Sequence, residues 1–336
     1  MDKNKISTNR AFLKDTLRLQ IDFSRTDQSQ RIDPPPVQKP FAEGRELIAL
    51  PEQDAFGAFY GTDLIEAIGH RRSQRHFLDL PLSLTELAFL LWATQGVWKT
   101  LRQGFSLLTV PSGGARNTFE TYLSVHRVTG LEAGLYRYLP LQHRLCLLRA
   151  DASIAEKVGD VWAKWVAKGA VVFFWTTIPY RKEWLYHPVF VAKCIAMDCG
   201  HVLQNLYLAS EAIGAGTCAV GTGCQEKMDA FLDVDGEEEF FIYGAPVGKL
   251  KLRRRVEWRG EIAEIEVEGD VTRIRVNPFW EGDAFVVAFS SGDFLDYAVG
   301  DLVEVKGEIV DMQSAYDGWP LLRGISIEKR REEPAS

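Results

Sequence analysis

The stretch PVFVAKCIAMDCGHVLQNLYLASEAIGAG, residues 188–216, decides the fold that we expect for this chain. Pro188 is a favourable first-turn residue, the following positions are apolar on most sides, and Gly214 stands where a helix would end. We therefore predict one long, buried helix. GAGTCA, residues 214–219, formally matches a dinucleotide-binding fingerprint, but that fingerprint needs a strand before it and a helix after it. Here the order is reversed, so we exclude a Rossmann site.

A polar stripe interrupts this apolar helix. Asp198, His201 and Asn205 recur at helical spacing, with Gln204 beside them. Because buried polar groups need partners, the stripe forms either a structural hydrogen-bond network or a surface toward a polar cofactor or a second subunit.

Between residues 62 and 255 the signals alternate between helix and strand. The apolar run AVVFFWTTI, residues 170–178, has the length of a buried central strand. Ser83 and Glu86 have the spacing of a helix capping box, and leucines at helical spacing follow them. Strand patterns also occur at residues 121–128, 134–140 and 143–150, and a helical pattern occurs at residues 152–169.

From about residue 259 the pattern changes to short strands alone. Five β-like stretches are separated by turn-forming clusters such as EGD, SGD and DGWP, which fits a small barrel of the OB type. Residues 259–336 carry 17 acidic and 8 basic side chains, and this excess of negative charge repels phosphate backbones. We therefore expect a packing or partner-contact role for the barrel, with binding of single-stranded nucleic acid as the weaker alternative.

Composition narrows the class of protein. The chain has 336 residues, a formal net charge of −7 and an ordinary globular share of hydrophobic residues. It has no apolar run of membrane-spanning length and no apolar signal core at the N-terminus, so we expect neither a membrane span nor secretion. Five cysteines without a C-x-x-C pair favour free thiols in a reducing cytoplasm. No histidine spacing supports a metal site, and no dominant basic face supports nucleic-acid binding.

Three segments carry candidate ligand contacts. RRSQRHF, residues 71–77, is either a solvated helix end or an anion site, since guanidinium groups suit phosphate oxygens. VPSGGARN, residues 110–117, is either a plain turn or a loop whose glycines let the backbone approach a ligand. GAPVGKLKLRRR, residues 244–255, is a second cationic cluster, either a local anion site or a solvated strand end.

The N-terminal residues 1–50 are polar and contain DPPPVQKP, residues 33–40. Three consecutive prolines favour an extended segment. We predict an arm that crosses another surface, with disorder as the alternative.

The order of these motifs resembles the nitroreductase-like flavoproteins. An R-R-S-x-R cluster precedes P-S-G-G, then a long helix with D-x-G-H-x-x-Q-N-L-Y-L-A, then G-x-G and a strand, and finally P-V-G-K. Within this family the chain is most similar to the SagB-type branch, which includes azoline-oxidising dehydrogenases of peptide-modifying pathways. The resemblance covers about residues 45–255. It implies an α+β fold in which a mainly antiparallel sheet is wrapped by helices. We divide the chain into the arm (1–50), an FMN domain (51–257) and the small all-β barrel (258–336).

The resemblance also implies a homodimer that holds FMN in clefts at its interface. The residues assigned to the cofactor in this way are Arg71, Arg72, Ser73 and Arg75 at the phosphate and the pyrimidine edge, Pro111, Ser112 and Gly113 from the partner chain, Val220 and Gly221 near flavin N5 with the Gly221 amide as a donor, Lys249 at the phosphate, and Asn205 near the interface or the cofactor.

The implied activity is FMN-dependent oxidoreduction. Hydride would pass between NAD(P)H or a substrate and a small conjugated acceptor, of nitro, quinone or azoline type, through flavin N5. Azoline-oxidising members carry a Lys-Tyr pair before the long helix, whereas PYRKEWLYHPVF here has none and offers only Lys182, Tyr186 and His187 as replacements. The alternative function is a non-catalytic flavin or ligand binder whose barrel contacts a protein partner.

Overall fold

The computed structural model describes residues 10–58, 64–102, 104–250, 255–268, 271–278, 285–289, 297–316 and 319–329. The chain divides into two compact units, Met1–Leu250 and Lys251–Ser336. Each unit has hydrophobic core residues of its own.

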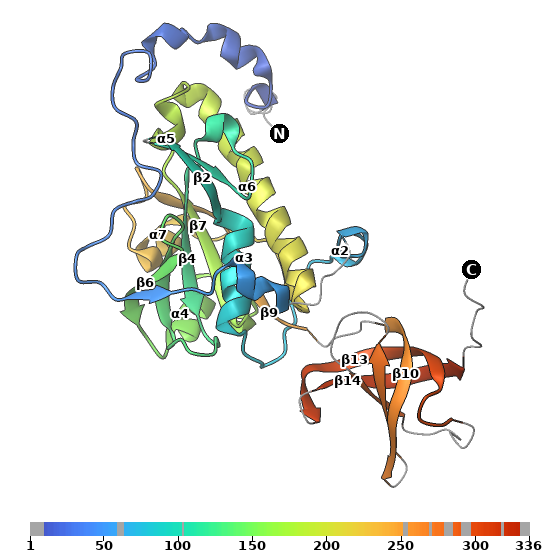
Figure 1. Cartoon of the computed structure of the whole chain (residues 1–336). Coiled ribbons are helices and arrows are strands. Elements are labelled where there is room, and N and C mark those ends of the chain that lie inside the picture. Colours follow the sequence, from blue (N-terminus) through green and yellow to red (C-terminus); the bar gives the residue numbers. More distant parts are fainter. Residues whose placement is uncertain are drawn as a thin grey trace, which may run out of the picture. The chain divides into compact units, whose positions relative to one another are not determined.

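The first unit is built on a seven-stranded sheet in the order β1-β6-β5-β4-β7-β9-β8, and each neighbouring pair is antiparallel (Figure 1). Its strands are β1 (Leu47–Ala49), β4 (Phe119–Val125), β5 (Gly134–Leu139), β6 (Arg144–Ala150), β7 (Val171–Thr177), β8 (Ala215–Thr217) and β9 (Phe240–Lys249), and a separate hairpin consists of β2 (Val97–Arg102) and β3 (Phe105–Leu108). The helices are α2 (Leu64–His70), α3 (Leu84–Gln95), α4 (Ile154–Val161), α5 (Tyr180–Glu183), α6 (Pro188–Ala212) and α7 (Gln225–Leu232). This confirms the predicted α+β fold with an antiparallel sheet and surrounding helices.

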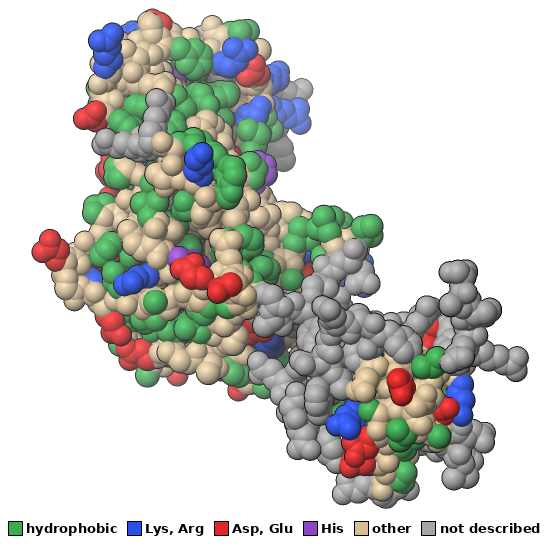
Figure 2. Space-filling view, in the orientation of Figure 1, with side chains coloured by type: hydrophobic (Ala, Val, Ile, Leu, Met, Phe, Trp, Pro, Cys, Tyr) green, Lys and Arg blue, Asp and Glu red, His purple; other side chains and the backbone are tan. Residues whose placement is uncertain are grey.

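Helix α2 is short and exposes apolar side chains. Leu64, Ile65 and Ile68 are 62%, 80% and 56% exposed. Figure 2 shows hydrophobic side chains gathered at the place of α2. A patch of this kind on a water-soluble surface commonly marks an interaction site.

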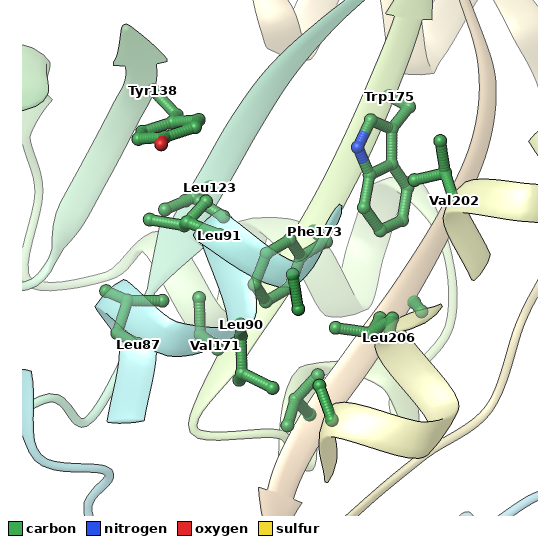
Figure 3. Packing of buried hydrophobic residues seen from close by; sticks show 14 of the residues in the cluster. Leu87, Leu90, Leu91, Leu123, Tyr138, Val171, Phe173, Trp175, Val202 and Leu206 are labelled. Carbon is green, nitrogen blue, oxygen red and sulfur yellow. The ribbon is translucent and has the colours of Figure 1, made fainter. Parts of the chain in front are cut away.

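The inner strand β7 is covered on both faces. Val171, Phe173 and Trp175 belong to one core cluster, whereas Val172 and Phe174 belong to another. Figure 3 shows the first cluster, to which α3 contributes Leu87, Leu90 and Leu91 and α6 contributes Val202 and Leu206. Alternate side chains of a strand point to opposite faces, so burial on both faces requires the continuous apolar run seen in the sequence. Each such side chain contributes about 1.5–3 kcal/mol when it leaves water.

The two helices that pack on this cluster begin as the sequence predicts. Glu86 N donates to Ser83 Oγ at 3.1 Å and Ser83 N donates to the Glu86 carboxylate at 2.8 Å, which completes the capping box of α3. Helix α6 begins at Pro188, and β8 follows directly after Gly214. A helix therefore precedes the G-x-G sequence and a strand follows it, which confirms the order on which the exclusion of a Rossmann site depends.

The helix predicted over residues 152–169 is wrong in its second half. Helix α4 ends at Val161, because the backbone of Trp162 turns away at φ −123° and ψ −84°. The Trp162 indole packs against Phe174 and Phe241 and donates to Thr222 O at 2.6 Å. These long-range contacts replace the next helical turn, and a short 3₁₀ turn follows at Val166–Lys168.

The described part of the N-terminal segment lies on the first unit. It contains 3₁₀ turns at Asp15–Gln20 and Phe23–Arg25, followed by the extended proline stretch. Backbone groups of the segment bond to buried side chains, as in the 2.6 Å bond from Lys39 N to Glu120 and the 3.0 Å bond from Arg137 to Pro40 O. Residues 1–9 of the predicted arm lie outside the described residues.

The second unit contains strands alone among its described residues. They are β10 (Arg255–Glu268), β11 (Val271–Pro278), β12 (Phe285–Phe289), β13 (Leu302–Tyr316) and β14 (Trp319–Lys329). Neighbours follow the order β10-β11-β12-β14-β13, and β13 also pairs with β10. The β12–β14 pair is parallel and the other pairs are antiparallel. The prediction of an all-β C-terminal region is confirmed.

Candidate functional site

The segment RRSQRHF follows α2 as extended backbone that continues the edge of the sheet. Ser73 forms a parallel bridge with Thr217 of β8, and Gln74 N donates to Thr217 O at 2.9 Å. Further along, Leu78 N donates to Lys249 O at 2.8 Å. The segment approaches β8 closely at Gly216, where a Cβ atom would lie 2.8 Å from the side chain of Gln74. The cationic cluster is therefore fixed against β8 and β9 rather than placed at the free end of a helix.

The three guanidinium groups of this segment have no carboxylate partner within the described residues. Arg71 lies over the Tyr207 ring at 4.9 Å and Arg75 lies over the Trp165 ring at 5.8 Å. Arg72 donates to Gly69 O and Arg71 O, each at 2.8 Å. Within the described residues, none of the three forms an ion pair with a carboxylate, although the whole chain is net acidic. Guanidinium groups held in this way suit a phosphate or another anion.

Tyr207 of α6 joins this segment to a second predicted one. Its hydroxyl lies 2.9 Å from Ser73 Oγ and accepts a hydrogen bond from Ala219 N, also at 2.9 Å. Tyr207 was not among the residues predicted from the sequence, because it falls outside the polar stripe. A tyrosine on a buried helix nevertheless needs a partner for its hydroxyl, and that requirement was the available signal.

The segment that contains Val220 and Gly221 is held on several sides. Val220 exchanges backbone hydrogen bonds with Gly244 at 2.8 and 3.2 Å. A Cβ atom at Gly221 would lie 3.2 Å from the Tyr243 ring, so the backbone passes closely over that ring. Among the described residues, the exposed Gly221 amide has no hydrogen-bond acceptor. An amide without an acceptor on a fixed backbone is a suitable donor for a ligand.

Residues 111–113, which were predicted to line the cofactor, contact α6 at a different position along its axis from Tyr207. His201 Nδ1 lies 3.2 Å from Pro111 O, and Gly113 N donates to the Asp198 carboxylate at 3.3 Å. Tyr207 lies nine positions after Asp198 in α6, which is about 13 Å along the helix axis. Within one chain, α6 thus anchors the 111–113 loop and the Ser73 region at separate places. Their contribution to one site from two chains stays a prediction.

Asn205 and Lys249 use their polar groups within the chain. Asn205 Nδ2 donates to Ala93 O at 2.8 Å, so this part of the stripe forms a structural hydrogen bond. Lys249 Nζ forms an ion pair with Glu86 and donates to Ile213 O at 3.1 Å. Their contact with a cofactor stays a prediction. The basic residues 251–254 lie outside the described residues.

The three candidate replacements for a Lys-Tyr pair have different surroundings. Lys182 is fully buried and pairs with Asp198. His187 caps α6, where its Nδ1 accepts from Val189 N at 3.4 Å. Burial is the main cause that raises the pKa of Tyr186, and the nearby Cys194 and Asp198 raise it further.

Sequence comparison identifies the protein family of this chain. The model of the family described as "Nitroreductase family" matches residues 68–249, more than half of the chain. The chain belongs to the nitroreductase family. A protein of Methanocaldococcus jannaschii that is named as a nitroreductase is 32% identical over 181 residues, which cover 53% of this chain and 87% of that protein.

Solved structures named as nitroreductases are also similar to this chain. One from Ralstonia eutropha has 23% identity and a TM-score of 0.48, covering 64% of this chain and 97% of the other. A second, from Exiguobacterium sibiricum and in complex with FMN, has 12% identity and a TM-score of 0.40, covering 56% and 89%.

Family membership fits what the residues can do. Nitroreductase family members bind FMN, and the chain is an FMN-dependent oxidoreductase of this family. The arginines beside Ser73, which have no carboxylate partner among the described residues, suit an anionic group such as a phosphate. In the described ranges no helix is long and apolar enough to cross a membrane. A search of the same ranges finds no cluster of three or more metal-ligating side chains.

Proposed function

We propose that the segment Arg71–Arg75 binds the phosphate of FMN in this chain. The observation that carries the proposal is the group of three guanidinium side chains without a carboxylate partner among the described residues. The Ser73 hydroxyl adds a neutral donor, and Tyr207 fixes its position. Phosphate oxygens would replace water around these groups at low cost, because the donors are already placed.

Val220 and Gly221 would face the flavin ring in the same site. Their support is the fixed backbone over Tyr243 and the Gly221 amide, which has no acceptor among the described residues. FMN, when bound, supplies two-electron exchange between a donor such as NAD(P)H and a small conjugated acceptor of nitro, quinone or azoline type. This chain's own residues then bind and orient the cofactor, and the cations stabilise negative charge near it.

We further propose that the protein is a homodimer in which Pro111, Ser112 and Gly113 of the second copy complete the site. The apolar side chains of α2 support an extensive contact, and α6 exposes Val189 and Met197 at 44% and 50%. An obligate dimer of this kind buries such residues. The five cysteines are all unpaired thiols, which supports function in the cytoplasm.

The finer placement in the SagB-type branch rests on the order of sequence motifs. The fully buried Lys182 is engaged by Asp198 and is therefore a poor proton acceptor for a substrate. Tyr186 has a raised pKa and would act, if at all, as a proton donor. We therefore favour nitro or quinone acceptors over azolines.

The second unit is proposed to be an OB-type barrel, residues 258–336, that contacts a protein partner. The strand order β10-β11-β12-β14-β13 with a parallel β12–β14 pair supports the barrel type. The acidic composition supports a basic protein surface over nucleic acid as partner. The alternative function, a non-catalytic flavin binder with this partner-binding barrel, would apply if bound FMN resisted reduction.

The test uses the purified full chain, loaded with FMN and desalted. We expect retained FMN that NAD(P)H reduces and a nitro or quinone compound reoxidises. Retained FMN that no donor reduces would support the non-catalytic alternative. A protein that retains no FMN would contradict both functions.

A further inference from the structure

A buried ion pair lies beneath the 111–114 loop and is not part of the site predicted from the sequence. Lys182 of α5 has no exposed side-chain surface, and the Asp198 side chain of α6 is 6% exposed. Lys182 Nζ contacts Asp198 Oδ2 directly. The two opposite charges compensate each other in the interior, because an unpaired buried charge is strongly unfavourable.

The carboxylate of this pair also holds the loop. Gly113 N lies 3.4 Å from Asp198 Oδ1 and 3.3 Å from Oδ2. Lys182 Nζ lies 3.5 Å from the position that a Cβ atom at residue 113 would take, so the ammonium group sits beside the glycine backbone. The carboxylate therefore bonds to the loop backbone at Gly113, and the ammonium group lies close to the same residue.

The neighbouring residues fix the loop on either side of this contact. His201 Nδ1, one turn along α6, lies 3.2 Å from Pro111 O. Gly114 has a positive φ of 68°, and a Cβ atom there would lie 2.8 Å from the Tyr186 hydroxyl. The loop is therefore bonded to α6 at Pro111 and packs closely at Gly114 against the residues between α5 and α6.

We propose that Lys182 and Asp198 are positioning residues that set the 111–113 loop for the cofactor. This inference rests on the proposed function, in which the loop lines FMN in the partner's site. Asp198 supplies the acceptor that fixes the Gly113 amide, and Lys182 orients that carboxylate and supplies its buried counter-charge. Neither side chain touches the cofactor in this scheme.

Two double variants separate the acceptor from the charges. Lys182→Met with Asp198→Asn removes both charges but keeps a side-chain oxygen for Gly113, whereas Lys182→Met with Asp198→Leu removes the oxygen as well. The FMN dissociation constant is measured by quenching of flavin fluorescence, and the melting temperature is measured without FMN. We expect the Asn double variant to bind FMN within a few-fold of the wild type. The Leu double variant should bind about tenfold more weakly, the effect of about one lost hydrogen bond to the partly buried Gly113 amide. Equal dissociation constants for the two doubles would overturn the proposal.

The single variant Lys182→Met keeps the test decisive if the Leu variant does not fold. It leaves Asp198 as an uncompensated buried carboxylate, so FMN binding should weaken and adding Asp198→Asn should restore it. No restoration would also overturn the proposal. A matched control replaces the adjacent buried pair, Arg181→Met with Glu120→Gln, which has no contact with residues 111–113 among the described residues; it should change the melting temperature but not FMN affinity. A wild-type chain that binds no FMN would instead contradict the proposed function itself.

Discussion

Replacing Tyr207 with Phe tests how the two halves of the proposed cofactor site are held together. The change removes one hydroxyl group and keeps the ring beneath the Arg71 guanidinium. That hydroxyl has two partners, Ser73 Oγ and Ala219 N, each at 2.9 Å. The variant therefore releases both segments at once without emptying the space that the ring fills.

The expected loss follows from these two contacts. Each hydrogen bond contributes about 1 kcal/mol, so the two contribute about 2 kcal/mol, with the larger share from the Ala219 amide that loses its acceptor. Part of this lost free energy lowers the stability of the FMN-free protein. The remainder weakens FMN binding, because both segments must then be ordered when FMN binds. Because about 1.4 kcal/mol corresponds to a tenfold change, we expect the FMN dissociation constant to rise about tenfold.

Titration of apoprotein with FMN, followed by flavin fluorescence, measures this change. Tyr136→Phe is a matched control, since its hydroxyl donates to Glu132 O at 2.8 Å and the residue has no contact with the site among the described residues. The control should keep the wild-type dissociation constant. A Tyr207→Phe protein with wild-type affinity and wild-type melting temperature would refute the role assigned to the hydroxyl.

Three further predictions concern charge. Burial lowers the pKa of His126 to about 4, below about 6.5 in the unfolded chain, so the unfolded chain binds more protons in this window. The contribution of His126 to the free energy of unfolding should be complete above pH 6.5 and should fall by roughly 3 kcal/mol as the pH drops through 4. Urea unfolding at several pH values measures this fall. The variant His126→Gln should show a flatter dependence of unfolding free energy on pH. Glu120→Gln should lower the free energy of unfolding by about 3–5 kcal/mol because Arg181 stays buried without its counter-charge; a wild-type denaturation midpoint would contradict this. Arg75→Ala should weaken FMN binding about tenfold with an unchanged melting temperature, because a charge-assisted phosphate contact is lost while no ion pair within the described residues is broken; FMN retained after gel filtration measures it, and equal retention by variant and wild type would argue against a phosphate contact.

The sequence predicted the helices and strands whose defining contacts or patterns lie within a few neighbouring residues. The Ser83–Glu86 capping box and the start of α6 at Pro188 depend on contacts within one helical turn. The apolar run at β7 reports burial on both faces, which any covered inner strand requires. These features are readable because their causes lie inside the same few residues.

Features that depend on distant partners were not predicted. Helix α4 ends at Val161 because the Trp162 indole packs against Phe174 and Phe241, which lie on other strands. Helix α7 and the β2–β3 hairpin were not predicted. Both elements are short, and their packing comes from the rest of the fold.

The candidate site shows the same division. The arginines of the 71–75 segment stood out as a local cluster. The ion pair between Lys249 and Glu86 joins residues 163 positions apart, so the sequence showed a free lysine where the structure has a compensated one. The sequence indicated that Asp198 needs a partner, but it did not identify Lys182, which lies on a different helix, as that partner.

The most direct test of the central claim is the visible absorption spectrum of the purified full-length chain after incubation with FMN and desalting, recorded before and after NAD(P)H is added. The proposed site predicts flavin absorption that remains with the wild-type protein, is bleached by NAD(P)H and is lost when Arg71, Arg72 and Arg75 are all replaced by Ala. A colourless wild-type protein, or a triple variant that keeps its flavin, would contradict the assignment of the Arg71–Arg75 segment as the cofactor's phosphate site.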